Sequence, residues 1–153
     1  MIQPEYVRQP ADHLTGESVV ALYFDDLRPL DGPAAVLDWR LDGQLTRMLL
    51  DGEIHGRAGE HVLLQGNSKL KADWVLFVGG GKWHGLCEET HAALVKHVLT
   101  VARQAGFSDL SLAFFQHEDF AVQKLHQQIM DALELLGKEI EFCRYTYYDD
   151  VAV

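Results

Sequence analysis

The sequence lacks any uninterrupted apolar segment of the ~20 residues that a membrane-spanning helix requires. Its first residues also contain no apolar stretch of signal-peptide length, so the sequence predicts a cytoplasmic protein with no membrane partner. Cysteine is scarce, since Cys87 and Cys143 are the only two. In a cytoplasmic chain we expect both to be free thiols, because disulfides persist mainly in oxidising compartments.

Basic residues are also fewer than acidic ones. The chain has 13 Lys and Arg against 23 Asp and Glu, which gives a formal net charge of -10 at pH 7. A field of that sign repels phosphate backbones, and no run of Lys or Arg opposes it locally. The composition therefore predicts no nucleic-acid partner.

The remaining composition is that of a globular protein. Hydrophobic residues make up 48% and charged residues 24% of 153 residues, and there is no internal repeat or low-complexity tract. We therefore expect residues 1–153 to form a single domain. Residues 1–15 are polar and contain two prolines, which indicates either a loose arm or an edge strand around Glu5, Tyr6 and Val7.

Strands and helices alternate along the chain. Short apolar runs predict strands at 18–24, 61–65, 73–78, 110–115 and 139–148. Single apolar stripes predict helices at 33–50 and 87–104, and a third over 122–136 that begins around residues 116–119. The turn-rich connection between 65 and 73 suggests an antiparallel hairpin, whose second strand is apolar on both faces and so should be an interior strand. This order predicts an α/β fold with helices covering a mixed sheet.

Three motifs follow one another in a particular order. Residues 26–33 lead into residues 37–45, and after about thirty residues a strand at 75–78 ends in Gly79-Gly80-Gly81-Lys82. This order resembles the N-terminal domain of the cytosol (leucyl) aminopeptidases, the M17 family of metallopeptidases. The resemblance covers about residues 19–115 well and the remainder loosely.

The resemblance implies a three-layer α/β/α fold with a mixed sheet, related to the macro domain. In that family, catalysis belongs to a larger C-terminal domain, which would begin about where this chain stops. The Asn-Thr-Asp-Ala-Glu-Gly-Arg segment of the family's two-metal site does not occur here. We therefore expect no catalytic residue, no metal and no cofactor, and no release of amino acids from leucyl amides.

A glycine-rich loop follows an apolar strand and precedes a predicted helix; its residues are Gly79, Gly80, Gly81 and Lys82. Free backbone N–H groups and the helix dipole at such a position favour an anion. One hypothesis is a small anionic ligand of the ADP-ribose or nucleotide type, by analogy with macro domains. It predicts that a bulky residue at Gly80 removes binding and leaves stability nearly unchanged. The other hypothesis is that the glycines only let the chain turn and pack closely.

A second candidate site lies just beyond this loop. Cys87 and His91 share a helix face and His84 precedes them, which permits a metal site, although a structural zinc site needs a fourth ligand. The same residues permit a Cys nucleophile with a His base, but no orienting acid is visible. His117-Glu118 is not a zinc-peptidase signature, because Ala121 stands where the second histidine belongs.

Three hypotheses about function follow. The first is a non-catalytic interaction or regulatory module whose partner is a second copy, in a dimer, or another protein chain. The second is a macro-like domain that binds a small anionic ligand through residues 79–82. The third is an enzyme that acts with a separate catalytic subunit or hydrolyses an ADP-ribose derivative alone. The aromatic side chains, Trp39 among them, either form exposed surface, which favours the first hypothesis, or pack within the monomer.

Overall fold

The boundaries of the elements follow the apolar pattern of the chain. The computed structural model describes residues 2–117, 119–136 and 139–148. The strands are β1 (Glu5–Tyr6), β2 (Ser18–Tyr23), β3 (His61–Gln65), β4 (Trp74–Gly79), β5 (Asp109–Phe115) and β6 (Phe142–Tyr148). The helices are η1 (Ala11–His13, a 3-10 helix), α1 (Gly32–Arg40), α2 (Gln44–Leu50), α3 (Glu88–Gln104) and α4 (Val122–Leu136). No helix in this part of the chain has both the length and the apolarity to cross a membrane.

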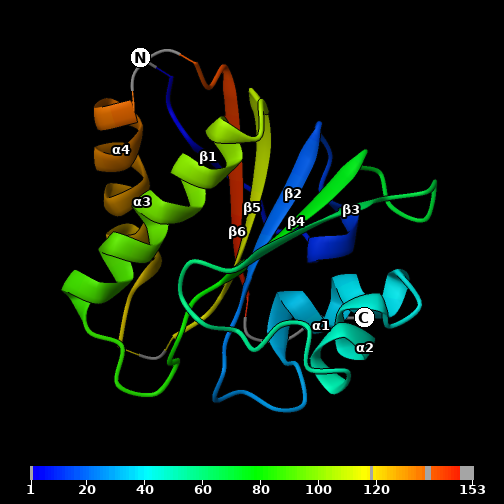
Figure 1. Ribbon diagram of the computed structural model, residues 1–153. Coiled ribbons are helices and arrows are strands. Elements are labelled where there is room, and N and C mark those ends of the chain that lie inside the picture. The colour runs from blue at the N-terminus through cyan, green and yellow to red at the C-terminus, as the bar shows by residue number, and fades with distance from the viewer. Residues whose placement is uncertain (1, 118, 137–138, 149–153) are drawn as a thin grey trace.

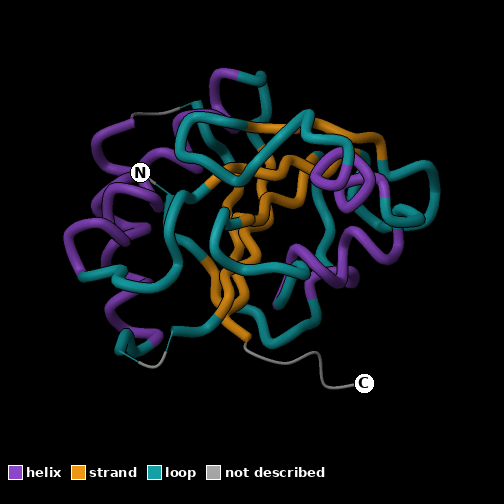
Figure 2. Tube along the Cα trace, turned by 60° about the horizontal axis from the view of Figure 1, so that its bottom comes forward, coloured by secondary structure: helices purple, strands orange, loops and turns teal. Residues whose placement is uncertain are grey.

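The strands form one mixed sheet in the order β1-β6-β5-β2-β4-β3. β3 pairs with β4 antiparallel and every other pair is parallel, so the predicted mixed sheet and hairpin are confirmed. Helices α3 and α4 cover one face, and η1, α1 and α2 cover the other (Figures 1 and 2). The predicted three-layer α/β/α arrangement is confirmed.

Each face of the sheet buries its own apolar core. Under α3 and α4 the core includes Leu99, Leu112 and Leu125, all fully buried. Under α1 and α2 it includes Leu37, Leu45 and Phe77. β4 contributes to both, because Leu76 and Phe77 point to opposite faces. This explains the doubly apolar pattern of its sequence.

The N-terminal residues follow the edge-strand alternative. β1 pairs with β6, the amide of Val7 donates to the carbonyl of Tyr145 at 2.9 Å, and Tyr6 stacks on Tyr145. The side chain of Thr146 donates to the carbonyl of Gln9. The loose-arm alternative for this segment is therefore wrong.

The single helix predicted over 33–50 is wrong. The chain forms α1 and α2 with a break at Asp42 and Gly43, which have φ angles of 61° and 74°. The buried carboxylate of Asp38 accepts a hydrogen bond from the amide of Leu45 at 2.7 Å and one from the hydroxyl of Thr46. A side chain of α1 therefore caps α2, and the apolar stripe continues across the break.

The predicted start of the last helix at 116–119 is also wrong, since α4 begins at Val122. Residues 116, 117 and 119 belong to a loop in which the amide of Asp119 donates to Nδ1 of His117. Glu118, which falls within the predicted start, lies outside the described residues. This loop lies at the carboxyl end of β5, where three loops of the sheet meet.

Candidate functional site

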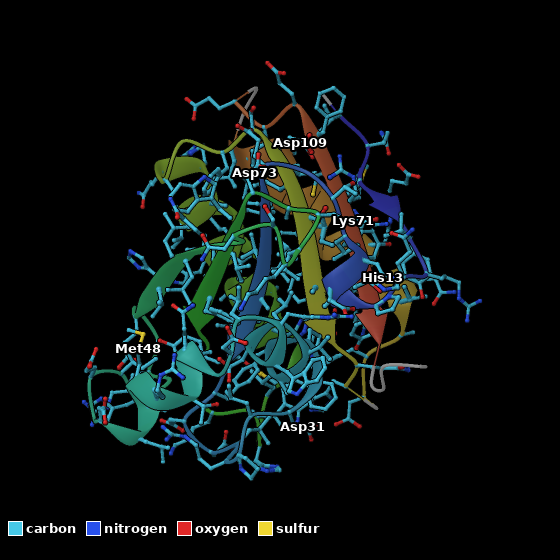
Figure 3. All side chains as sticks on the ribbon, turned by 90° about the vertical axis from the view of Figure 1, so that its right-hand side faces the viewer. His13, Asp31, Met48, Lys71, Asp73 and Asp109 are labelled. Carbon is cyan, nitrogen blue, oxygen red and sulfur yellow. The ribbon has the colours of Figure 1, made fainter. Side chains whose placement is uncertain are left out.

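The loops after β2, β4 and β5 meet at one end of the sheet, because these strands are parallel. Figure 2 turns this end toward the viewer, and Figure 3 shows Asp31 there, with Asp73 and Asp109 at the opposite end. Open α/β sheets bind ligands at the carboxyl ends of their strands, so this end is the first place to look for a site.

The glycine loop is closed by hydrogen bonds within the chain. The amides of Gly79, Gly80 and Gly81 each donate to a main-chain carbonyl at 2.8 Å; the acceptors are Glu60, Tyr23 and Gly56. The ammonium of Lys82 lies 2.9 Å from the carboxylate of Asp25. These three amides therefore do not face open space, and the geometry favours a turn that packs closely. Anion binding by Gly79–Lys82 stays a prediction.

The expectation that Gly80 tolerates a bulky residue is wrong. A Cβ atom at Gly80 would lie 2.4 Å from the ring of Phe24. The glycine is needed for close packing, so a larger residue at this position would disturb the fold as well as any ligand.

Asp26 links the loop after β4 to the loop after β2 through hydrogen bonds. Its carboxylate accepts hydrogen bonds from the amides of Trp83 at 2.7 Å and His84 at 2.9 Å. Burial on its own would raise the pKa of Asp26, but these two hydrogen bonds outweigh burial and leave the pKa below its ordinary value. The carboxylate therefore stays ionised and holds residues 83 and 84 in place.

An aromatic cluster fills the space beside this loop and borders a cavity. The indole of Trp83 stacks on Phe115 at 5.0 Å and meets Phe24 and His117 at 5.2 and 4.9 Å. The cavity has a volume of about 440 Å³, and its lining is Trp83, His84, Gly85, Phe115, Gln116, His117 and Asp119. Sequence reasoning missed the members after β5. Their position directly after a parallel strand was the signal that would have found them.

A larger groove opens on the α1 and α2 side. It has a volume of about 1120 Å³ and is bordered by Trp39, Arg40, Arg47 and Lys69, among others. Trp39 is 75% exposed, and the guanidinium of Arg40 lies 5.4 Å from its ring centroid. The side chains of Arg47 and Lys69 hold the left-handed Asp42 through its carbonyl and carboxylate. The groove thus joins an aromatic surface to three cationic groups.

The proposed ligands of the second candidate site point in different directions. Cys87 is exposed and starts α3, where its amide and Thr90 exchange capping contacts. His91 is buried, and its Nδ1 lies 2.7 Å from the side-chain oxygen of Gln128. Among the described residues no three His, Cys, Asp or Glu side chains lie together as metal ligands would. Cys143 is buried, and neither cysteine forms a disulfide.

We expect the buried His91 to make the fold sensitive to mild acid. Burial among Phe114 and Phe120 lowers the pKa of His91 below its ordinary 6.5, against the opposing effect of Gln128. Above the ordinary pKa of 6.5 the ring is neutral in the folded and in the unfolded chain, and its contribution to stability is complete. As the pH falls, the unfolded chain takes up the proton first and stability is lost toward the lowered pKa.

Urea midpoints measured between about pH 7 and about pH 5 test this prediction. The His91→Gln variant keeps a polar group beside Gln128 and should lose part of the pH dependence. His13→Gln, which removes an exposed histidine, should keep it. Equal pH dependence in the wild type and His91→Gln would contradict the prediction.

Comparisons of sequence with known proteins agree on one family. Residues 19–142 match the cytosol aminopeptidase family, N-terminal domain. The chain is 30% identical over 122 residues to a probable cytosol aminopeptidase of Glaesserella parasuis, covering 80% of this chain and 24% of that protein. It is 33% identical over 86 residues to a cytosol aminopeptidase of Pseudomonas aeruginosa, covering 56% of this chain and 17% of that protein. The chain thus spans less than a quarter of the length of these relatives.

Solved structures match the fold at low sequence identity. Tomato leucine aminopeptidase, as a mutant, gives a TM-score of 0.71 at 13% identity, over 100% of this chain and 34% of that one. A Trypanosoma brucei macrodomain in complex with ADP-ribose gives a TM-score of 0.64 at 20% identity, over 93% and 62% of the two chains. The expected macro-domain-like fold is confirmed.

Proposed function

The chain belongs to the cytosol aminopeptidase family through that family's N-terminal domain, and on this basis we propose that it is a non-catalytic module that binds a protein partner. The observation that carries the proposal is the groove around Trp39. An indole that is 75% exposed costs free energy in water, and burying it against a partner recovers that cost. Tryptophan and arginine are also the residues that most often dominate the energy of protein interfaces.

The charges of the groove indicate what kind of surface its partner presents. The chain has a formal net charge of -10 at pH 7, yet Arg40, Arg47 and Lys69 gather at this groove. Asp38 is buried and used within the fold, Lys69 pairs with Asp42, which also lines the groove, and Arg40 pairs with Asp12. The positive charge around the indole is therefore largely compensated within the chain. We therefore assign the groove to a protein that offers an apolar contact for Trp39 and a hydrogen-bond acceptor for the guanidinium of Arg47.

The closed loop at the strand ends supports a binding module over an enzyme. Catalysis by this family's chemistry needs carboxylates that converge on metal ions. Three carboxylates at this end of the sheet, those of Asp25, Asp26 and Glu60, bond instead to Lys82 and to main-chain amides. Their role here is to hold loops together.

Affinity purification from cells of the source organism, followed by binding measurements with the purified partner, tests the proposal. We expect Trp39→Ala to weaken binding by about 2 kcal/mol, or roughly 30-fold. Leu50→Ala is the matched control, because Leu50 is 80% exposed on α2 but outside the groove. Equal binding by both variants, or release of leucine from leucyl amide by the repurified protein, would overturn the proposal.

A second candidate function is the binding of an ADP-ribose-type ligand in the cavity beside Trp83. The observation that favours it is an aromatic cavity of about 440 Å³ at the carboxyl ends of the strands, in a chain whose fold matches a macrodomain in complex with ADP-ribose. A ligand at a hundredfold excess over its Kd stabilises the native state by roughly 2.7 kcal/mol.

This second function predicts that ADP-ribose raises the melting temperature by several degrees. Gln116→Trp should abolish the rise by filling the cavity, while the ligand-free protein melts nearly unchanged, because Gln116 is exposed. Gln104→Trp, at an exposed position on α3 away from the cavity, should keep the rise. If ADP-ribose does not shift the melting temperature, the cavity does not bind this class of ligand.

A further inference from the structure

β3 is an edge strand of the sheet. β3 lies at the end of the sheet, and β4 is its one partner within residues 2–117, 119–136 and 139–148 (Figure 1). Natural sheets usually protect such an edge with proline, lysine or a β-bulge. β3 contains neither residue, and its register with β4 runs without a bulge from His61 to Gln65.

The hydrogen bonds of the hairpin determine which backbone groups of β3 point outward. The amide of Gly79 donates to the carbonyl of Glu60, and the amide of Gly66 donates to that of Asp73, each at 2.8 Å. In an antiparallel pair the hydrogen-bonded positions alternate, so residues 60, 62, 64 and 66 bond to β4. His61, Leu63 and Gln65 therefore present their amides and carbonyls to the outside.

These outward residues form a set that is symmetric about Leu63. When two copies of β3 pair antiparallel with Leu63 opposite Leu63, His61 of each copy faces Gln65 of the other. Every outward residue then exchanges two hydrogen bonds with its counterpart. If the register shifts by one pair, some outward amides and carbonyls lose their hydrogen-bond partners. The symmetric register therefore forms the most hydrogen bonds between the two strands.

The side chains at this edge also fit a second copy. Val62 belongs to the core under α1 and α2 and Leu64 packs against it, so by alternation Leu63 lies on the opposite face of the sheet. Leu63 is 41% exposed, and the pairing would place two such leucines side by side. The outward residues carry no carboxylate, ammonium or guanidinium group. Two chains of net charge -10 can therefore meet here without opposing like charges within the paired strands.

The carboxylate that directly precedes β3 is turned inward. Glu60 accepts hydrogen bonds from the amides of His55 and Gly56 and from the hydroxyl of Tyr23. Lys69, beyond the other end of the strand, is held by Asp42. We propose that two copies of this chain associate around a twofold axis through Leu63, so that their sheets join into one. This proposal is independent of the groove around Trp39.

Crosslinking at Leu63 tests the proposed register. Residues in a hydrogen-bonded antiparallel pair have Cα atoms about 5.5 Å apart, within reach of a short thiol-to-thiol bis-maleimide. In a Cys87→Ser background, which removes the exposed native thiol, Leu63→Cys should form a covalent dimer with this reagent. Leu50→Cys, an exposed leucine on α2, should stay a monomer under the same conditions. Equal crosslinking of the two variants overturns the proposal.

Light scattering of the full chain provides the second measurement. The wild type should show twice the mass of one chain, and Leu63→Lys should show the monomer mass, because it sets two ammonium groups side by side at the axis. Circular dichroism should show that this variant stays folded, since Leu63 is partly exposed. A monomeric wild type at the highest concentration reached, or a Leu63→Lys variant that remains a dimer, overturns the proposal.

Discussion

Replacement of Gly79 by alanine should lower the free energy of unfolding by about 3 kcal/mol, which is a large share of the stability of a domain this size. A Cβ atom at this position would lie 2.1 Å from the carbonyl oxygen of Arg57. That oxygen belongs to the main chain, so no side-chain rotation relieves the overlap. The segment that contains it is held by Glu60, whose carboxylate binds the amides of His55 and Gly56. The segment cannot move away without breaking those bonds.

Thermal unfolding followed by circular dichroism measures this loss as a fall of roughly 10 °C. Gly85→Ala is the matched control in the same loop. Gly85 has a φ angle of 91° and an added Cβ atom there meets nothing within 4 Å, so the cost should be limited to backbone strain of roughly 1 kcal/mol. A Gly79→Ala variant that loses no more stability than Gly85→Ala would contradict the packing argument.

Removal of the Asp38 carboxylate is expected to cost about 2 kcal/mol. Asp38 is 5% exposed, and its carboxylate accepts from the amide of Leu45 at 2.7 Å and the hydroxyl of Thr46 at 2.5 Å. Asp38→Ala leaves the first amides of α2 without an acceptor in a buried place. We therefore expect α2 to loosen and the groove around Trp39 to lose its shape together with stability.

Chemical denaturation of Asp38→Ala gives the size of this effect, and hydrogen exchange of the amides of Leu45 and Thr46 locates it. Asp38→Asn keeps an acceptor oxygen and should lose less. Asp51→Ala, an exposed carboxylate just after α2, should change the free energy of unfolding by under about 0.5 kcal/mol. Unchanged exchange of the α2 amides in Asp38→Ala would show that the cap is not what holds the helix.

The sequence alone predicted those parts of the fold whose signal is local. The apolar runs of β2, β4 and β5 and the stripes of α3 and α4 mark elements that bury one or two faces. The spacing of apolar residues along the sequence indicates which faces are buried. The break between α1 and α2 was missed because the apolar stripe continues across it. The deciding contact joins Asp38 to Leu45 through a side chain.

The candidate site was less predictable because its state depends on distant segments. A glycine-rich turn after a strand has the same local sequence whether its amides are free or bonded. Here the acceptors are the carbonyls of Tyr23, Gly56 and Glu60, which no pattern within residues 79–82 reveals. The cluster of cationic groups beside Trp39 likewise gathers residues from α1, α2 and the hairpin loop, and the topology alone brings them together.

The position of β2 in the middle of the sheet has a consequence for synthesis of the chain on the ribosome. Its hydrogen-bond partners are β4 and β5, which begin at Trp74 and Asp109. The apolar residues 19–22 therefore emerge long before either neighbour exists, and a nascent chain that ends before β4 has nothing to pair with them. Contacts of such wide sequence separation form slowly, and unpaired apolar strands are prone to aggregate. The fold thus leaves β2 without its sheet neighbours during synthesis until translation reaches the strands that flank it.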